Sequence, residues 1–210
     1  VNFLALLGWA PGGDRELMSR DELVATFGLE GISGGNAVFD TAKLDWMNGQ
    51  YIATLPVDQL AARVIPLLEE ASLWPPADDR ADASWLHRLL ELLRPRAKRL
   101  TDFVEQARPF LVDTVEYDAD ALQKHFASTG MAAHVTALAD ALRALTPFDE
   151  PHVETAVRGT AEQRSLKAGV LIHAVRVGIT GRTTSPGIFE SLVLLGKSRT
   201  LDRKSTRLNS

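Results

Sequence analysis

Apolar residues recur every three or four positions along most of the chain, which is the spacing of helices that bury one face. One such face carries Leu60, Val64, Leu67 and Leu68, and a second carries Trp85, Leu86, Leu89, Leu90 and Leu93. Runs of alternating β-branched and polar residues, which are typical of strands, are scarce. The pattern therefore predicts an all-α fold with almost no sheet.

Several predicted helices have recognisable ends. Ser19 followed by Glu22 forms a capping-box pattern ahead of an apolar run. Later in the chain, Ser185 is a fit N-cap, Pro186 a fit first helical residue and Gly196 a fit stop. Further helices are predicted over residues 101–110, 118–127, 131–145, 150–163, 165–178 and 186–195.

Prolines mark two interruptions of the helical pattern. Pro75 and Pro76, followed by a small and charged stretch, read as a linker, and the pattern restarts at Asp82 or Ser84. Pro95 ends or kinks the helix before it, because proline lacks an N–H and clashes with the preceding turn. We expect a first unit over residues 1–75 and a second over residues 80–201.

The composition of the 210 residues, 45% hydrophobic and 24% charged, is that of ordinary globular domains. No apolar run approaches the roughly 20 residues that span a bilayer, and no signal peptide is recognisable, so we expect a cytoplasmic protein with no membrane partner. The absence of cysteine excludes disulfides and thiolate metal sites. The five histidines show no ligand spacing, and we expect no metal site.

Positive charge is concentrated late in the chain. The formal net charge is −4, which argues weakly against a general nucleic-acid binder and against DNA as a partner. Residues 151–201, however, hold seven basic and three acidic side chains, a net charge of +4. Because phosphate binding needs local positive charge, this segment is a candidate, although scatter over solvated faces would explain the charge equally well.

Two runs carry a family resemblance. Lys43 to Ile52 reads KLDWMNGQYI, and Ile179 to Glu190 reads ITGRTTSPGIFE. With VNFLALLGW at the start, AVFD before the first run and LLRPR at Leu92 to Arg96, they resemble bacterial glutamyl-tRNA synthetases in the part that follows the catalytic domain. The resemblance covers residues 1 to about 201, in matching order and spacing.

The resemblance implies both a fold and a function. Residues 1–75 correspond to a helical unit that contacts the tRNA stem, and residues 80–201 to a helical anticodon-binding bundle. The parent enzyme is a class I aminoacyl-tRNA synthetase, a glutamate–tRNA ligase that attaches glutamate to tRNA(Glu) with ATP and Mg²⁺. The implied partner is tRNA(Glu), and the implied state is a monomer.

The chain lacks both ATP-binding signatures of class I synthetases, His-x-Gly-His and a Lys-Met-Ser-Lys-Ser-like loop. We therefore expect a non-catalytic fragment with no catalytic residue and no cofactor of its own. Three alternatives stay open. The chain is a stand-alone RNA-binding module derived from a synthetase, it belongs to a non-discriminating enzyme that also charges tRNA(Gln), or it is a purely structural bundle.

The last nine residues, DRKSTRLNS, match the translation of a common sequencing-library adapter. We treat residues 202–210 as an artefact tail and expect them to make no stabilising contact. The alternative is a natural basic, polar tail.

A cluster of cations at the kinked helix end is the first candidate site. Four cations lie within six residues, among them Arg96 and Lys98. Cations also favour a helix C-terminus, which would explain them without a ligand. The resemblance assigns Arg96 to the third anticodon base, which a guanidinium fork can pair with or stack on. Lys98 is the expected contact to the tRNA backbone.

The second run supplies the other candidates. The resemblance places Arg176, Ser185, Pro186 and Ile188 in the pocket for the first two anticodon bases, and Arg158 near the anticodon. Free N–H groups at a helix N-terminus and an apolar surface suit a base. From the residues alone, an ordinary capped helix is the simpler explanation.

The resemblance also assigns tRNA backbone contacts to the first run. Lys43 and Trp46 lie on its helix, near the inner corner of the L-shaped tRNA in the family. Lys43 is the expected phosphate contact, as a point charge. Met47 is expected in the core.

Overall fold

The computed structural model describes residues 1–13, 15–35, 38–76 and 78–208. Within these residues helices and loops make up the structure, with no β-strand and one isolated antiparallel bridge between Trp9 and Ile32. The predicted all-α fold is confirmed. In the described part of the chain, none of the helices combines the length and the apolar character needed to cross a membrane.

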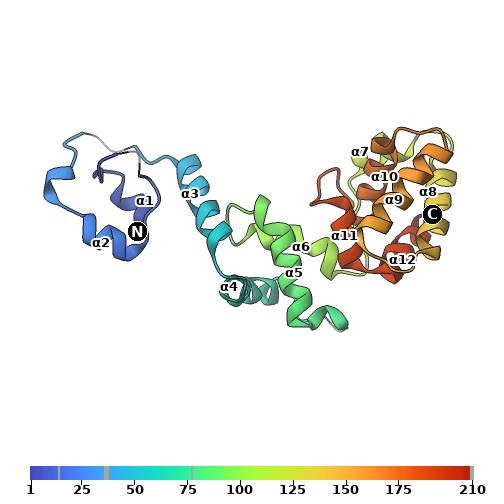
Figure 1. The fold of residues 1–210 in the computed structure, drawn as a ribbon, viewed down its shortest axis with the longest axis horizontal. Helices are drawn as coiled ribbons and strands as arrows, with labels where there is room; N and C mark the ends of the chain where they lie inside the picture. The colour runs from blue at the N-terminus through green and yellow to red at the C-terminus, as the bar shows by residue number, and fades with distance from the viewer. Residues whose placement is uncertain (14, 36–37, 77, 209–210) are drawn as a thin grey trace. The chain divides into compact units, whose positions relative to one another are not determined.

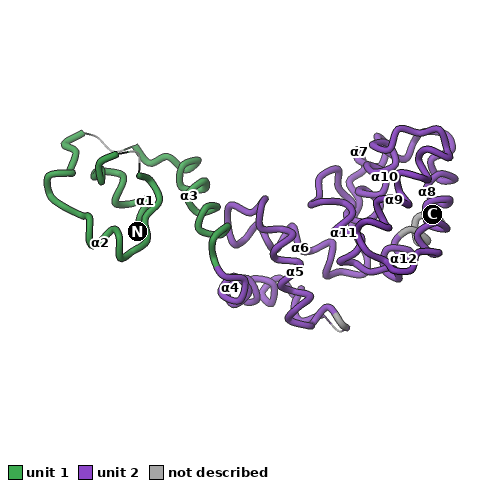
Figure 2. Tube along the Cα trace, viewed as in Figure 1, with its two compact units in different colours: residues 1–55 green, residues 56–210 purple. Residues whose placement is uncertain are grey.

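The chain divides into two compact units, Val1–Leu55 and Pro56–Ser210 (Figure 2). This division precedes the Pro75–Pro76 linker, because the helix that follows Pro56 packs against helices of the second unit. A functional boundary between residues 75 and 80 stays a prediction.

The first unit is built around a small apolar core. Its helices are α1 (Asn2–Ala5), α2 (Arg20–Thr26), the 3₁₀ turn η1 (Leu29–Gly31) and α3 (Thr41–Thr54). Trp9, Met18 and Leu23 form the core, and the Trp9 indole donates to the Gly28 carbonyl at 3.0 Å. The capping box predicted from Ser19 and Glu22 is present at the start of α2.

The first signature run forms most of α3 and serves the structure of this unit. Met47 is buried, as predicted. The Tyr51 hydroxyl donates to the Met18 carbonyl at 2.8 Å and accepts from the Asn2 amide at 2.7 Å. Because these bonds join α3 to both ends of the segment before α2, the run fixes the fold around it.

The second unit holds the remaining helices. They are α4 (Val57–Glu70), η2 (Asp79–Ala81), α5 (Ala83–Leu93), η3 (Arg94–Arg96), α6 (Asp102–Leu111), α7 (Ala119–Phe126), α8 (Met131–Ala144), α9 (Glu150–Gln163), α10 (Ala168–Thr180), α11 (Ile188–Leu195) and α12 (Lys197–Leu208). Helices α4 to α6 pack together, and α7 to α12 form a bundle (Figure 1).

The stripe predicted on α5 joins these two parts. Its members, Trp85, Leu86, Leu89, Leu90 and Leu93, are all buried. Asp82 caps the helix by accepting from the Trp85 N–H at 3.1 Å. The Trp85 indole donates to the Leu194 carbonyl on α11 at 3.0 Å, which ties α5 to the bundle.

A buried arginine fixes the loop before α5. Arg80 is 3% exposed and donates to the Leu111 carbonyl at 2.9 Å. It also forms ion pairs with Asp78 at 2.6 Å and with Asp113 at 2.9 Å. Burial alone lowers the pKa of Arg80, but its two carboxylate partners outweigh this effect and raise the pKa. The charge of Arg80 is therefore well compensated.

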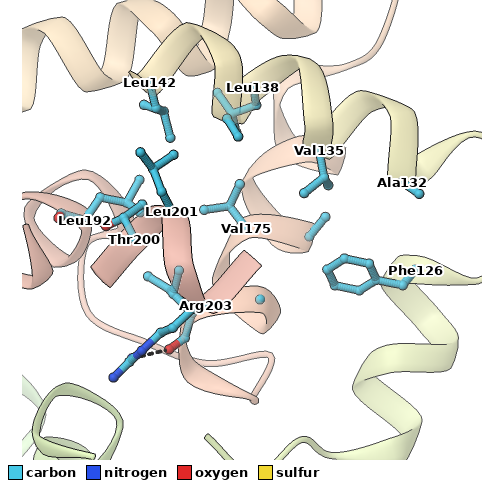
Figure 3. Close-up of a pocket in the computed structure, with 14 residues that line it drawn as sticks. Phe126, Ala132, Val135, Leu138, Leu142, Val175, Leu192, Thr200, Leu201 and Arg203 are labelled. Atoms are coloured by element: carbon cyan, nitrogen blue, oxygen red, sulfur yellow. Dashed lines mark hydrogen bonds between the residues drawn. The ribbon is translucent and has the colours of Figure 1, made fainter. Parts of the chain in front are cut away.

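An apolar cavity of about 240 Å³ lies inside the bundle, between α7, α8, α10 and α12 (Figure 3). Phe126, Val135, Leu138 and Val175 contribute to its wall, and the aliphatic stem of Arg203 lies at its α12 side. Protein cores rarely leave voids much larger than a water molecule, so packing is looser here than around α5.

Arg203, inside the suspected tail, is part of the packed structure. Its side chain is 7% exposed and donates to the Ile179 carbonyl at 2.8 Å and to the Val112 carbonyl. The expectation that residues 202–210 make no stabilising contact is therefore wrong for Arg203, because α12 continues through it and carries its guanidinium into the bundle. The suspected origin of the tail stays a prediction.

We expect replacement of Arg203 by Met to lower the free energy of unfolding by about 1 kcal/mol, because it leaves two carbonyl groups without their donor. The expected loss of stability is small because the fold disfavours the charge of Arg203. Burial, and secondarily the charge of Arg80, lowers the pKa of Arg203 to about 10. Urea unfolding followed by circular dichroism measures it. Arg63→Met is the matched control, since Arg63 is exposed and bonds the Gln59 carbonyl of its own helix. Equal stability of the two variants would restore the expectation of a featureless tail.

Helix α10 begins later than predicted, at Ala168 instead of Ser165. Ser165 has a left-handed backbone, with φ of 54°, and the Leu166 N–H bonds back to the Ala161 carbonyl. These features end α9 and leave no helical start at Ser165. The helix also runs past Gly178 and stops at Gly181.

Candidate nucleic-acid interface

Arg96 lies where α5 gives way to a short 3₁₀ turn. Helix α5 ends at Leu93, and η3 carries Pro95, which confirms the predicted interruption. Arg96 is exposed, and its guanidinium makes no hydrogen bond or ion pair within the described residues. Its neighbour Arg94 is instead paired with Glu91 at 3.2 Å. Arg96 therefore presents all its donors to an external partner.

A tight turn after α10 brings the second run toward Arg96. Gly181 ends α10 with φ of 73°, and its N–H bonds to the Val177 carbonyl at 2.8 Å. A Cβ at this position would lie 1.9 Å from the Glu116 carbonyl oxygen. Only glycine combines that close approach with a left-handed backbone, so Gly181 determines the path of the turn.

The helix after this turn starts later than predicted. Helix α11 begins at Ile188 with Gly187 as its N-cap, so Ser185 is not the cap and Pro186 is not the first helical residue. The Ser185 hydroxyl instead accepts from Arg176 Nε at 2.9 Å and donates to the Pro186 carbonyl at 2.9 Å. Gly196 is the stop, as predicted.

Three of the predicted residues meet in one cavity of about 220 Å³. Arg96 enters from η3, and Ser185 and Pro186 enter from the turn before α11. The rest of the wall comes from α6 and the same turn, and consists of Glu105, Gln106, Pro109, Phe110, Thr180, Arg182 and Thr184. The cavity thus combines apolar surfaces with hydrogen-bonding groups, which is what an unstacked base requires.

Arg176 supports this cavity from α10 without lining it. Besides bonding Ser185, it lies with Nη1 3.1 Å from His173 Nδ1. Partial burial, and secondarily the charge of Arg96, lowers the pKa of Arg176. The charge of Arg96 therefore acts on Arg176, and an anionic or electron-rich ligand near Arg96 would relieve this repulsion.

A stacked histidine pair lies beside Arg176. His125 on α7 lies against His173 on α10, with ring centroids 5.2 Å apart. Burial, then the charges of His173, Lys124 and Arg176, lowers the pKa of His125. In the described part of the chain, no group of three or more His, Cys, Asp or Glu side chains is placed to hold a metal ion.

The structure does not bring Ile188 and Arg158 into the cavity. Ile188 is 5% exposed and packs in the bundle as the first residue of α11. Arg158 on α9 pairs with Glu154 at 2.7 Å, and its guanidinium lies 5.9 Å from the centroid of the Phe189 ring. Contacts of these two residues with an anticodon stay predictions.

Three predicted backbone contacts lie elsewhere. Lys98 is exposed beside η3, and its N–H donates to the Asp102 carboxylate at 2.8 Å. In the first unit, Lys43 pairs with Glu16 at 2.6 Å, and Trp46 is 41% exposed. A phosphate would have to replace Glu16 as the partner of Lys43.

Sequence reasoning missed five polar members of the cavity. Thr180, Arg182 and Thr184 lie within the second signature run, so the resemblance could have pointed to them. Glu105 and Gln106 lie on α6, where no motif marks them. Glu105 pairs with Arg182 at 3.2 Å across the cavity.

The convergence of Arg96 with the turn before α11 agrees with a family model for an anticodon binding domain, which matches residues 59–205. The chain belongs to this family.

Its curated relatives include glutamate–tRNA ligases. The ligase of Moorella thermoacetica is 34% identical over 97% of this chain and 41% of that protein. Glutamate–tRNA ligase 2 of Caldicellulosiruptor saccharolyticus is 36% identical, again over 97% of this chain and 41% of that protein. The chain thus spans about two fifths of the length of these relatives.

Solved structures share the fold over the whole chain. A glutamate tRNA ligase from Elizabethkingia meningosepticum, crystallised with its amino acid, superposes with a TM-score of 0.88 at 22% identity. The match covers 100% of this chain and 40% of that one. The glutamate-tRNA synthetase of Elizabethkingia anophelis gives a TM-score of 0.84 at 21% identity over the same shares.

Proposed function

We propose that this chain recognises tRNA(Glu) through its anticodon, as the tRNA-binding part of a glutamate–tRNA ligase. The single observation that carries the proposal is the convergence of Arg96, Ser185 and Pro186 on one cavity. A donor-rich guanidinium, a polar turn and apolar walls suit a base extruded from a single-stranded loop.

The charges around the cavity support an RNA ligand. Arg96 has no carboxylate partner within the described residues, and its positive charge helps to lower the pKa of Arg176. Phosphates of an anticodon loop would compensate these charges, and Lys98 lies beside Arg96 to bind a neighbouring phosphate. Lys43 and Trp46 would contact the tRNA backbone from the first unit.

The ligase reaction itself would belong to the longer protein. ATP and Mg²⁺ would be held by the catalytic part of the parent enzyme, because the chain carries neither signature of that site. We assign the protein to the cytoplasm and expect a monomer. Of the alternatives, a stand-alone module and a non-discriminating enzyme are not favoured, since the similar proteins are glutamate–tRNA ligases.

We expect the purified chain to bind a tRNA(Glu) transcript without aminoacylating it, and to lose affinity as salt rises. A site that neutralises about three phosphates should lose roughly ten- to twenty-fold between 50 and 200 mM salt, through counterion release. Fluorescence anisotropy measures the affinities, and a DNA hairpin of the same anticodon arm is the control.

Binding that does not respond to salt, or that is equal for the DNA hairpin, would contradict tRNA recognition by this site. Glutamylation by the purified chain would contradict its assignment as the non-catalytic part.

A further inference from the structure

Gln106 carries an unpaired acceptor at the wall of the cavity. The residue is half-buried on α6 and lines the cavity together with Arg96 and Pro186. Its side-chain oxygen, Oε1, is shielded from solvent and has no hydrogen-bond partner within the described residues. Because such an oxygen normally finds a donor, a ligand N–H is the group that would complete it.

Most other polar groups of the cavity are donors or are already engaged. Arg96 offers only N–H groups, and Arg182 is paired with Glu105. The Thr180 hydroxyl donates to the Arg176 carbonyl at 2.8 Å and accepts from the Arg182 N–H. The Gln106 side-chain oxygen is therefore an acceptor that still lacks a donor, and the amine of a base could supply one.

Resting on the proposed function, we propose that Gln106 reads the third anticodon base together with Arg96. Cytosine presents two acceptors, O2 and N3, beside the N4 amine on its Watson–Crick edge. The Arg96 fork donates to the acceptors, and Gln106 Oε1 accepts from the amine after a rotation of the amide into the cavity. Uracil presents a carbonyl oxygen in place of the amine, which would face the oxygen of Gln106, and an N3–H in place of one acceptor, which would face the donors of Arg96.

In this assignment, two residues recognise one base. Arg96 separates cytosine from the larger guanine, and Arg96 and Gln106 together separate cytosine from uracil, with Gln106 reading the amine. The uracil case is relevant because a third anticodon base of U belongs to tRNAs that carry other amino acids. Gln106 is thus a specificity-determining residue for tRNA choice.

The test uses the full chain and two tRNA(Glu) transcripts that differ only by cytosine or uracil at the third anticodon position. We expect the wild-type chain to prefer cytosine by about ten-fold, the scale of one good base contact. Gln106→Leu should reduce the ratio several-fold, to the part that Arg96 supplies through the N3 position. Gln106→Glu keeps an oxygen acceptor, so it should keep the ratio while its charge weakens both RNAs.

Glu105→Gln is the matched control, because Glu105 is the neighbouring acceptor of the same cavity. It should leave the cytosine-to-uracil ratio unchanged. An unchanged ratio in Gln106→Leu, a ratio that moves in Glu105→Gln instead, or no cytosine preference in the wild-type chain would overturn the role of Gln106. In those outcomes salt-dependent tRNA binding would persist, whereas loss of all tRNA binding would overturn the proposed function as well.

Discussion

Replacing Arg80 by Met should lower the free energy of unfolding by about 1.5–3 kcal/mol, the range for losing hydrogen bonds that involve a charged group, because its carboxylate partners are themselves partly or largely exposed. The change strips the Leu111 carbonyl of its donor, leaves Asp113 without its cation and leaves Asp78 with Arg199 as its remaining cation. It should cost more than Arg203→Met, because Arg80 is compensated by carboxylates and Arg203 bonds only carbonyl groups.

The same network predicts a pH dependence of stability. The hydrogen bond from Arg80 holds the pKa of Asp78 well below its usual range. A carboxyl group with a lowered pKa in the folded state stabilises the fold above its unfolded pKa, near 4, and this contribution is lost as the pH falls below that value. Stability should therefore fall below about pH 4 in the wild-type chain, and less steeply in Arg80→Met.

Urea unfolding at pH 7 and at pH 3 measures both effects, with Arg63→Met as the control for loss of an exposed arginine. A loss below about 1 kcal/mol for Arg80→Met at pH 7 would show that the loop before α5 does not depend on this network.

Replacing Arg96 by Gln should narrow the preference for tRNA(Glu) over tRNA(Gln), whose third anticodon bases are cytosine and guanine. A fixed guanidinium donates to the acceptors of cytosine, and a bulkier guanine must displace it. Loss of one good base contact costs about 1–3 kcal/mol, which is roughly a five- to 150-fold change in affinity. Arg96 has no internal partner in the described structure, so the substitution should leave the fold intact.

Paired affinities for two transcripts that differ only at that base provide the measurement. Lys98→Ala is the control, because a phosphate contact should weaken both transcripts alike. If Arg96→Gln leaves the ratio of the two affinities unchanged, Arg96 does not read the base and only provides a favourable positive charge at the C-terminal end of its helix.

Sequence patterns predicted well those helices whose apolar faces and ends are marked by residues within the helix or next to it. The stripe on α5 and the bounds of α9 follow from apolar periodicity and adjacent end signals. The start of α11 was predicted wrongly, because the hydroxyl of Ser185 is taken by Arg176, on another helix. No pattern within the run around Ser185 reveals that bond.

The candidate site was predictable only in part, for a similar reason. Arg96, Ser185 and Pro186 were named through the family resemblance, and their convergence depends on packing between distant segments. Gln106 has no sequence signal, because a polar residue on a helix usually faces solvent. The lack of a partner for its side-chain oxygen can be recognised only from the folded structure, in which α6 packs beside the turn after α10.

The mutual repulsion of the Arg96 and Arg176 guanidinium groups implies a conflict between thermal stability and tRNA recognition. A carboxylate between them would stabilise the free protein, and selection for heat resistance alone would favour it. The same carboxylate would repel the phosphates that the site is proposed to bind. Variants that gain thermal stability by placing a carboxylate at this surface should therefore lose affinity for tRNA.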